Sequence, residues 1–332
     1  MASFDSSKID FEIVDALIND LKAELSSSGV ELEGPASVAG YIGYFDAVKQ
    51  PSSYDHVPPE ARHLIEIIEA TGGPDISETY HRLVLLTLVQ QLEKRAATLG
   101  VPKKQHDRTL GFLKKLVRRL QKPKPGQYRI DRDEFLKDLA VARLKLWPCG
   151  AELVDIASGI PRRMLLRAGA GQFIKTLGQV KFHCGGFKPF FETHFDQRMT
   201  REFSAEGYRS LYLTIAEMLQ HAPAIRGMFS GSWWHDPALA DISPNLAFLN
   251  SIAVAGGARL FPLGTDDQII ARATRLSKER TRLVREDVYQ PTSYLMVWAR
   301  KDLLRWAEAQ TTVWTARSKL PTSASPNPFP SS

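Results

Sequence analysis

Apolar residues recur at helical spacing through the first third of the chain. In residues 11–25, Phe11, Val14, Leu17, Ile18 and Leu21 lie three or four positions apart, so one helix face would carry them all. Prolines and glycines, which mark helix starts and ends, help to delimit three further helical segments, residues 58–73, 76–100 and 103–121. A Pro-, Gly- and Lys-rich stretch, residues 122–126, then interrupts the pattern. We therefore predict a helical region over residues 1–125.

Beyond this stretch, alternating and helical patterns are mixed. Strands are predicted at residues 127–131, 151–157, 162–168, 172–183, 188–195, 225–234 and 259–264. Helices are predicted at residues 132–147, 205–223, 243–258 and 266–289, and residues 292–307 start as a strand and finish as a helix. The predicted class is α+β, in which a helical N-terminal half precedes a mixed-sheet α/β domain over residues 126–315.

The amino-acid composition says more about where in the cell the protein is expected than about what it does. The 332 residues carry a net charge of +6 and only two cysteines, Cys149 and Cys184, which favours a reducing cytoplasm over a disulfide framework. No apolar run is long enough for a membrane span. The Pro/Ser-rich residues 316–332 are predicted to be a disordered tail. A cytoplasmic protein with an anionic ligand or partner fits this balance.

The strand at residues 188–195 carries a set of polar groups. Because side chains alternate along a strand, Glu192, His194 and Asp196 are expected on one face. His194 and Asp196 form an H-x-D pair, and a distant histidine, His235 or His221, would complete a two-histidine, one-carboxylate iron(II) site of the oxygenase kind. The other interpretation is an ordinary strand with one solvated or ion-paired face, in which the adjacent Cys184 is a small buried residue.

Two further segments have chemistry of their own. Trp233 and Trp234 stand beside His235 and Asp236, a combination typical of a ligand pocket and also of a strand-to-helix turn.

The helix at residues 103–124 carries Lys103, Lys104, Arg108, Lys114, Lys115, Arg118, Arg119, Lys122 and Lys124 against Asp107 alone. This face would suit an acidic partner such as a carrier protein, and a non-enzymatic interaction protein is one hypothesis. Nucleic acid is disfavoured because few aromatic residues are interleaved with the charges.

Several familiar catalytic motifs are missing from the sequence. It holds no phosphate-binding G-x-x-x-x-G-K-[ST], no G-x-S-x-G elbow, no H-E-x-x-H and no paired C-x-x-C. Their absence argues against P-loop enzymes, the usual serine hydrolases and the usual zinc sites.

The order of elements from residue 127 to residue 306 resembles the GNAT-type N-acyltransferase superfamily. The segment FFETHFDQR would be the strand that borders the splayed gap of the fold, and YRSLYLTIAEML would be the helix after it. Between them lie Arg198, Arg201 and Gly207, where the family binds the acyl-CoA pyrophosphate at a helix N-terminus. The paired glycines of the family loop are absent, and residues 266–289 are foreign to the minimal fold.

The resemblance implies transfer of an acyl group from acyl-CoA, or from an acyl carrier protein, to an amine of a small molecule or peptide. It further implies a base, for which Glu192 and His194 are the candidates. Tyr208 or Tyr212 would protonate the leaving thiolate. An iron(II)-dependent oxygenase and an interaction protein stay as the alternative hypotheses.

Overall fold

The computed structural model describes residues 9–160 and 170–318, and its N-terminal half is helical, as predicted. Helix α6 has the bounds expected from the sequence, while the predicted helix 76–100 is divided at Gln91. The helices of this half are α1 (Phe11–Ser27), α2 (Val38–Asp46), α3 (Pro59–Gly72), α4 (Pro74–Gln90), α5 (Leu92–Leu99), α6 (Lys103–Gln121) and α7 (Asp133–Ala142). A buried apolar cluster joins these helices, with α4 at its centre.

The junction between the halves differs from the prediction at two points. Residues 127–131 form turns instead of a strand. The predicted helix 132–147 ends at Ala142, because Leu144 adopts a positive φ of 62° and the N–H of Lys145 donates to the carbonyl of Ala140, 2.8 Å away. That left-handed turn closes the helix and frees the next residues to form a strand.

Six strands form one sheet in the order β1-β2-β3-β4-β6-β5. They are β1 (Leu146–Pro148), β2 (Glu152–Ser158), β3 (Phe190–Phe195), β4 (Gly227–Ser232), β5 (Arg259–Gly264) and β6 (Ser293–Ala299). Every neighbouring pair is antiparallel except β3 and β4, which are parallel. The fold is therefore α+β with a mixed sheet, as the sequence predicted.

The parallel pair separates soon after it forms. Only Phe191 with Met228 and Glu192 with Phe229 are in register, so the last three residues of each strand have no partner across the pair. The ends of β3 and β4 thus diverge in the middle of the sheet, and their facing backbone groups lack ladder hydrogen bonds to each other.

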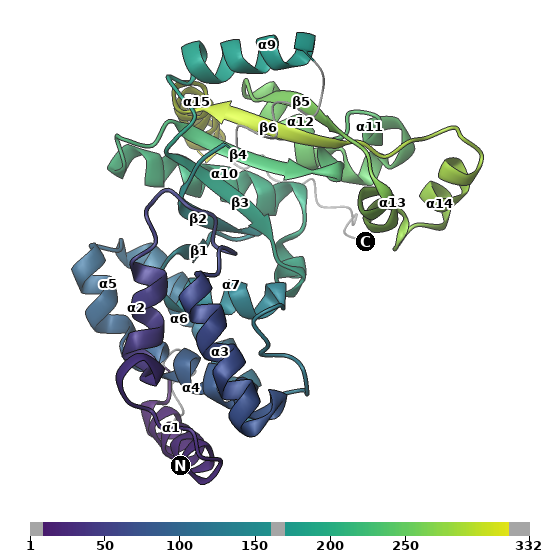
Figure 1. Cartoon of the computed structure of the whole chain (residues 1–332). Coiled ribbons are helices and arrows are strands. Elements are labelled where there is room, and N and C mark those ends of the chain that lie inside the picture. The colour runs from purple at the N-terminus through teal and green to yellow at the C-terminus, as the bar shows by residue number, and fades with distance from the viewer. Residues whose placement is uncertain (1–8, 161–169, 319–332) are drawn as a thin grey trace, which may run out of the picture.

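Helices cover both faces of the sheet (Figure 1). On one face, α10 (Ala205–His221), α12 (Phe248–Ala255) and α15 (Arg300–Ser318) pack on a core that includes Phe191, Met228 and Trp298. On the other face, α9 (Ala170–Gly178) and a π-helical turn, Gln179–His183, cover a smaller core around Phe190 and Phe229.

Two predictions near α9 have different outcomes. The strand predicted at residues 172–183 is wrong, because Phe173, Leu177 and Val180 recur at helical rather than alternating spacing. The strand predicted at residues 162–168 lies outside the described residues.

The long helix predicted at residues 266–289 is also wrong. The segment forms two short helices, α13 (Asp267–Thr274) and α14 (Lys278–Arg285). Ser277 separates them, because its hydroxyl accepts a hydrogen bond from the N–H of Arg280 and caps α14. Figure 1 shows this helix pair beyond the sheet, at the end to which β4 points.

The packing of the helical half continues past the predicted boundary at residue 125. Phe135 and Leu139 of α7, with Leu146 of β1 and Leu153 of β2, belong to the same apolar cluster as α1–α6. The boundary therefore stays a prediction. At the other end, α15 reaches Ser318, three residues into the predicted tail, and residues 319–332 lie outside the described residues. No helix in the described ranges is long and apolar enough to cross a membrane.

Candidate active site

A cleft of about 1900 Å³ lies where β3 and β4 diverge. Its walls come from both halves of the chain: the α6–α7 connection and the start of α7 on one side, and α13–α14 on the other. The diverging strand ends, Thr193–Phe195 and Ser230–Ser232, border it between these walls. The cleft is therefore open to the backbone groups that the parallel pair leaves unpaired.

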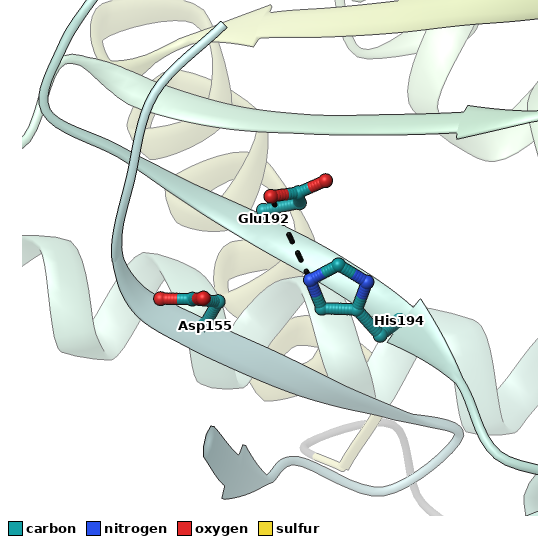
Figure 2. A group of neighbouring side chains, drawn as sticks. All are labelled: Asp155, Glu192 and His194. Carbon is teal, nitrogen blue, oxygen red and sulfur yellow. Dashed lines mark ion pairs between the residues drawn. The ribbon is translucent and has the colours of Figure 1, made fainter. Parts of the chain in front are cut away.

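His194 is the titratable side chain of β3 that borders this cleft. Its ring meets the ring of Tyr54 edge-on, with centroids 4.4 Å apart, and its side chain is 15% exposed. Nε2 lies 3.6 Å from Oε2 of Glu192, whereas the other ring nitrogen points away from that carboxylate (Figure 2). Burial lowers the pKa of His194 to about 3, and the charge of Lys137 adds to the effect. The imidazole is therefore neutral at physiological pH.

Glu192 lies behind His194 on the same face of β3, as the sequence predicted for this pair. Oε2 accepts a 2.6 Å hydrogen bond from the hydroxyl of Ser158 on β2. Burial raises the pKa of Glu192 to about 7. The hydrogen bond from Ser158 lowers this pKa, whereas the negative charges of Asp155 and Asp55 raise it. A carboxyl group that titrates near neutral pH suits proton transfer, and its neighbour His194 reaches the cleft.

Asp155 of β2 joins these two residues to form a group of three metal-ligand types (Figure 2). Their ligand atoms lie within 4.8 Å of one another. The ammonium of Lys145, however, lies 2.8 Å from Oδ1 of Asp155 and also donates to Gln50 and to the carbonyl of Ala157. This cation already balances the buried carboxylate, so the arrangement favours an ion pair over a metal site.

The iron site predicted from His194, Asp196 and His235 is not formed. Asp196 sits just past the end of β3 and pairs with the guanidinium of Arg198 at 2.5 Å. His235 is 1% exposed in the turn after β4 and does not border the cleft. Among the described residues, the metal-ligand types that do come together are Asp155, Glu192 and His194, and Lys145 pairs with that aspartate, so the predicted iron ligands are not assembled.

The helical half supplies residues to this centre that the sequence did not indicate. The hydroxyl of Tyr54 donates to Oδ1 of Asp133 at 2.5 Å, and the ammonium of Lys137 donates to Oδ2 of Asp133 and to the carbonyl of Phe195, each at 2.7 Å. Burial opposes ionisation of Asp133, but the two hydrogen bonds outweigh it and lower its pKa. These residues are over 50 positions from β3 in sequence, and no motif connects them.

The predicted phosphate loop is engaged in other contacts. Arg198 pairs with Asp196 and, at 2.8 Å, with Asp138, which also pairs with Arg119 at 3.0 Å. Arg201 does not border the cleft. The N–H of Gly207 donates to the hydroxyl of Ser204, the N-cap of α10, so it is not available to a phosphate.

Gly207 has a packing role instead. A Cβ at this position would lie 1.8 Å from the carbonyl oxygen of Glu202, which explains why a residue without a side chain is needed there. Arg198 borders the cleft but is held by two carboxylates, and its predicted role in phosphate binding, like that of Gly207, stays a prediction.

The two tyrosines predicted as general acids are buried on the other face of the sheet. Both side chains are 1% exposed in the core under α10. The Tyr208 hydroxyl donates to Glu152 at 2.6 Å, and burial raises the pKa of Tyr208 and of Tyr212 well above the ordinary value. Neither borders the cleft, so neither is placed to protonate a leaving group.

The predicted substrate pocket divides into two parts. Trp233 and Trp234 border the cleft. Asp236 does not: its carboxylate accepts hydrogen bonds from Tyr289, Thr292 and Ala238, each about 3 Å long, and so fixes the chain between β4 and β6. The interpretation as a turn therefore holds for Asp236 and His235, while the tryptophans stay candidate pocket residues.

Comparisons with known proteins give one likeness and no family. No family model matches the chain, and no curated protein matches it. A solved structure described as the crystal structure of an acyltransferase in complex with decanoyl-CoA is 16% identical, covers 87% of this chain and 99% of its own, and superposes with a TM-score of 0.43. At that score and identity the likeness has no bearing on the roles assigned above.

Proposed function

We propose that the chain is a GNAT-type N-acyltransferase that moves an acyl group from acyl-CoA to an amine. The observation that carries the proposal is the parallel pair β3–β4, which diverges into the cleft beside His194 and Glu192. A gap between two parallel strands gives a linear, amide-bearing donor unpaired backbone groups to bind. The histidine and the glutamate at its edge supply a base.

The order of the elements supports the same proposal. β3 leads through a 3₁₀ turn, Gln197–Glu202, into α10, and β4 follows as its parallel neighbour. The last strand, β6, inserts between β4 and β5. This arrangement is the one that the resemblance to GNAT-type enzymes implies, and it places the diverging ends at the middle of the sheet.

The proposed chemistry assigns one role to each residue of the pair. The amine nitrogen attacks the thioester carbonyl, the C–N bond forms, and the C–S bond breaks to release the CoA thiolate, to which a water molecule relays the proton that His194 takes from the amine. The amine proton passes to the cleft-facing nitrogen of His194. Ionised Glu192, 3.6 Å from Nε2, stabilises the imidazolium that results.

The test is an assay of thiol release with a panel of acyl-CoAs and amines, in which mass spectrometry identifies the acylated product. His194→Gln keeps a polar side chain but cannot act as a base, and it should reduce turnover at least about 100-fold. Wild-type protein that releases no thiol beyond the amine-free rate, with any donor, would rule the function out.

A separate observation favours an acyl carrier protein as the acyl donor in place of free acyl-CoA. Lys115 and Arg118 of α6 and Lys122, which directly follows the helix, are exposed basic residues at helical spacing. Lys122 and Lys124 also border the cleft, so this basic stripe leads to it. Arg119 of the predicted docking face is instead paired with Asp138. An acidic carrier could therefore dock along α6, and kcat/KM for acyl carrier protein against acyl-CoA, in wild type and in Lys115→Glu/Arg118→Glu, separates the two donors.

A further inference from the structure

The wall of the cleft formed by α13 and α14 contains a buried cation without an acidic partner. Arg280 is 8% exposed and donates to the carbonyl of Ala273 at 2.6 Å and to the hydroxyl of Ser243 at 3.0 Å. Its guanidinium lies 5.1 Å from the ring centre of Trp233. No carboxylate among the described residues forms an ion pair with it. Burial of an unpaired charge destabilises the folded chain, and a bound anion would offset that cost.

Two exposed arginines extend this charge along the same wall. Arg272, in the last turn of α13, and Arg275, just after it, border the cleft with Arg280, and the described residues offer neither an ion-pair partner. Glu279, the acid next to Arg280 in sequence, also borders the cleft, but its carboxylate pairs with Arg282 at 2.7 Å. The wall thus presents three guanidinium groups to the cleft, the geometry that suits phosphate oxygens.

The loop between β3 and α10 offers little to an anion in this chain. Arg198 is held by Asp196 and Asp138, and the N–H of Gly207 is held by Ser204. The phosphates of a donor must therefore find their cations elsewhere along the cleft. Trp233 directly follows β4, so the α13–α14 wall begins where the diverging strands end.

We propose that Arg272, Arg275 and Arg280 form the binding site for the phosphates of acyl-CoA. The identity of the ligand rests on the proposed function, whereas the anion site rests on the arginines themselves. In this arrangement the thioester end of the donor lies between β3 and β4, beside His194, and the nucleotide end lies against α13 and α14. The two-helix segment, foreign to the minimal fold, replaces the usual phosphate loop.

The experiment compares two donors that differ only in the phosphates. One is an acyl-CoA, and the other is the same acyl group on N-acetylcysteamine, which has a thioester but no nucleotide. In Arg272→Ala/Arg275→Ala, KM for acyl-CoA should rise at least about tenfold, while kcat/KM for the short thioester stays within about twofold of wild type. Calorimetry with CoA alone should show the same loss of affinity without any turnover.

Two further variants make the result specific. Arg285→Ala removes an exposed arginine in the last turn of α14 that does not border the cleft, and should leave both donors unaffected. Arg280→Gln keeps a hydrogen-bonding side chain and should repeat the CoA-specific loss.

Each remaining outcome is decisive. Equal losses with both donors, no loss with either, or wild-type protein that does not bind CoA would overturn the phosphate site. Failure of acyl transfer with every donor, combined with CoA binding that the arginine variants abolish, would instead reject the proposed reaction and keep the site.

Discussion

Nε2 of His194 lies 3.6 Å from Oε2 of Glu192. Burial lowers the pKa of His194 and raises that of Glu192, so the histidine has the lower pKa of the two. The histidine stays neutral down to a pKa of about 3, and the carboxyl group keeps its proton up to a pKa of about 7. In most histidine–carboxylate pairs the carboxylate is the first to ionise and the imidazole holds the proton. Here the form competent as a base, neutral His194 beside ionised Glu192, accumulates only above about pH 7.

The pH dependence of turnover should show this directly. We expect kcat to rise with a slope of one up to about pH 7, because ionisation of Glu192 limits the base, and then to level off. In Glu192→Gln this limb should disappear and kcat should fall about 10- to 100-fold. A titrating acceptor amine could produce a similar limb, so the profile should be repeated with an amine of different pKa. A limb that persists in Glu192→Gln would contradict the assignment.

The same pKa has a consequence for stability. The pKa of Glu192 is higher in the folded state than in the unfolded chain, so between about pH 4.5 and 7 the folded state holds more protons. The contribution of Glu192 to the free energy of unfolding should therefore fall as the pH rises through this range and should not change further above it, whereas His194, whose pKa is lowered, contributes in the opposite direction. Glu192→Gln should remove this loss and be more stable than wild type at pH 8, by at most about 3 kcal/mol.

Urea unfolding at pH 5 and pH 8 provides the measurement. The matched control is Glu206→Gln, an exposed glutamate in the first turn of α10, whose difference from wild type should be the same at both pH values. If Glu192→Gln also shows no change with pH relative to wild type, its carboxyl group is not shifted as inferred.

Tyr54 should position His194 through its ring more than through its hydroxyl. The ring contacts His194 at 4.4 Å, while the hydroxyl reaches only Asp133. Tyr54→Phe keeps the ring and should keep kcat within about threefold, whereas Tyr54→Ala should lower kcat about 10- to 100-fold with little change in KM for acyl-CoA. A merely structural role would lower the melting temperature of both variants without this difference between kcat and KM. Equal kcat values in the two variants would refute the positioning role.

The sequence predicted those parts of the site that depend on local pattern. Alternation along β3 placed Glu192 and His194 on one face, and the element order anticipated a diverging strand pair beside them. The sequence pattern could not indicate Tyr54, Asp133 or Lys137, because these residues reach β3 only when the helical half folds against the sheet. It also assigned Arg198 to phosphate, since a sequence does not reveal that Asp138 and Asp196 hold that guanidinium. The strand predicted at residues 172–183 gave too little weight to the helical spacing of Phe173, Leu177 and Val180, which the structure follows in α9 and the π-helical turn.

Asp138 should stabilise the contact between the two halves of the chain. Its carboxylate is 2% exposed and pairs with Arg119 of α6 and with Arg198 after β3, at 3.0 and 2.8 Å. Asp138→Ala leaves both guanidinium groups, which are themselves mostly buried, without that partner, so the free energy of unfolding should fall by about 3–5 kcal/mol. Asp107→Ala removes an exposed carboxylate that pairs with Lys103 and should change it by less than about 0.5 kcal/mol. Urea unfolding followed by tryptophan fluorescence measures both, and a loss below about 1 kcal/mol for Asp138→Ala would show that the bridge contributes little to stability.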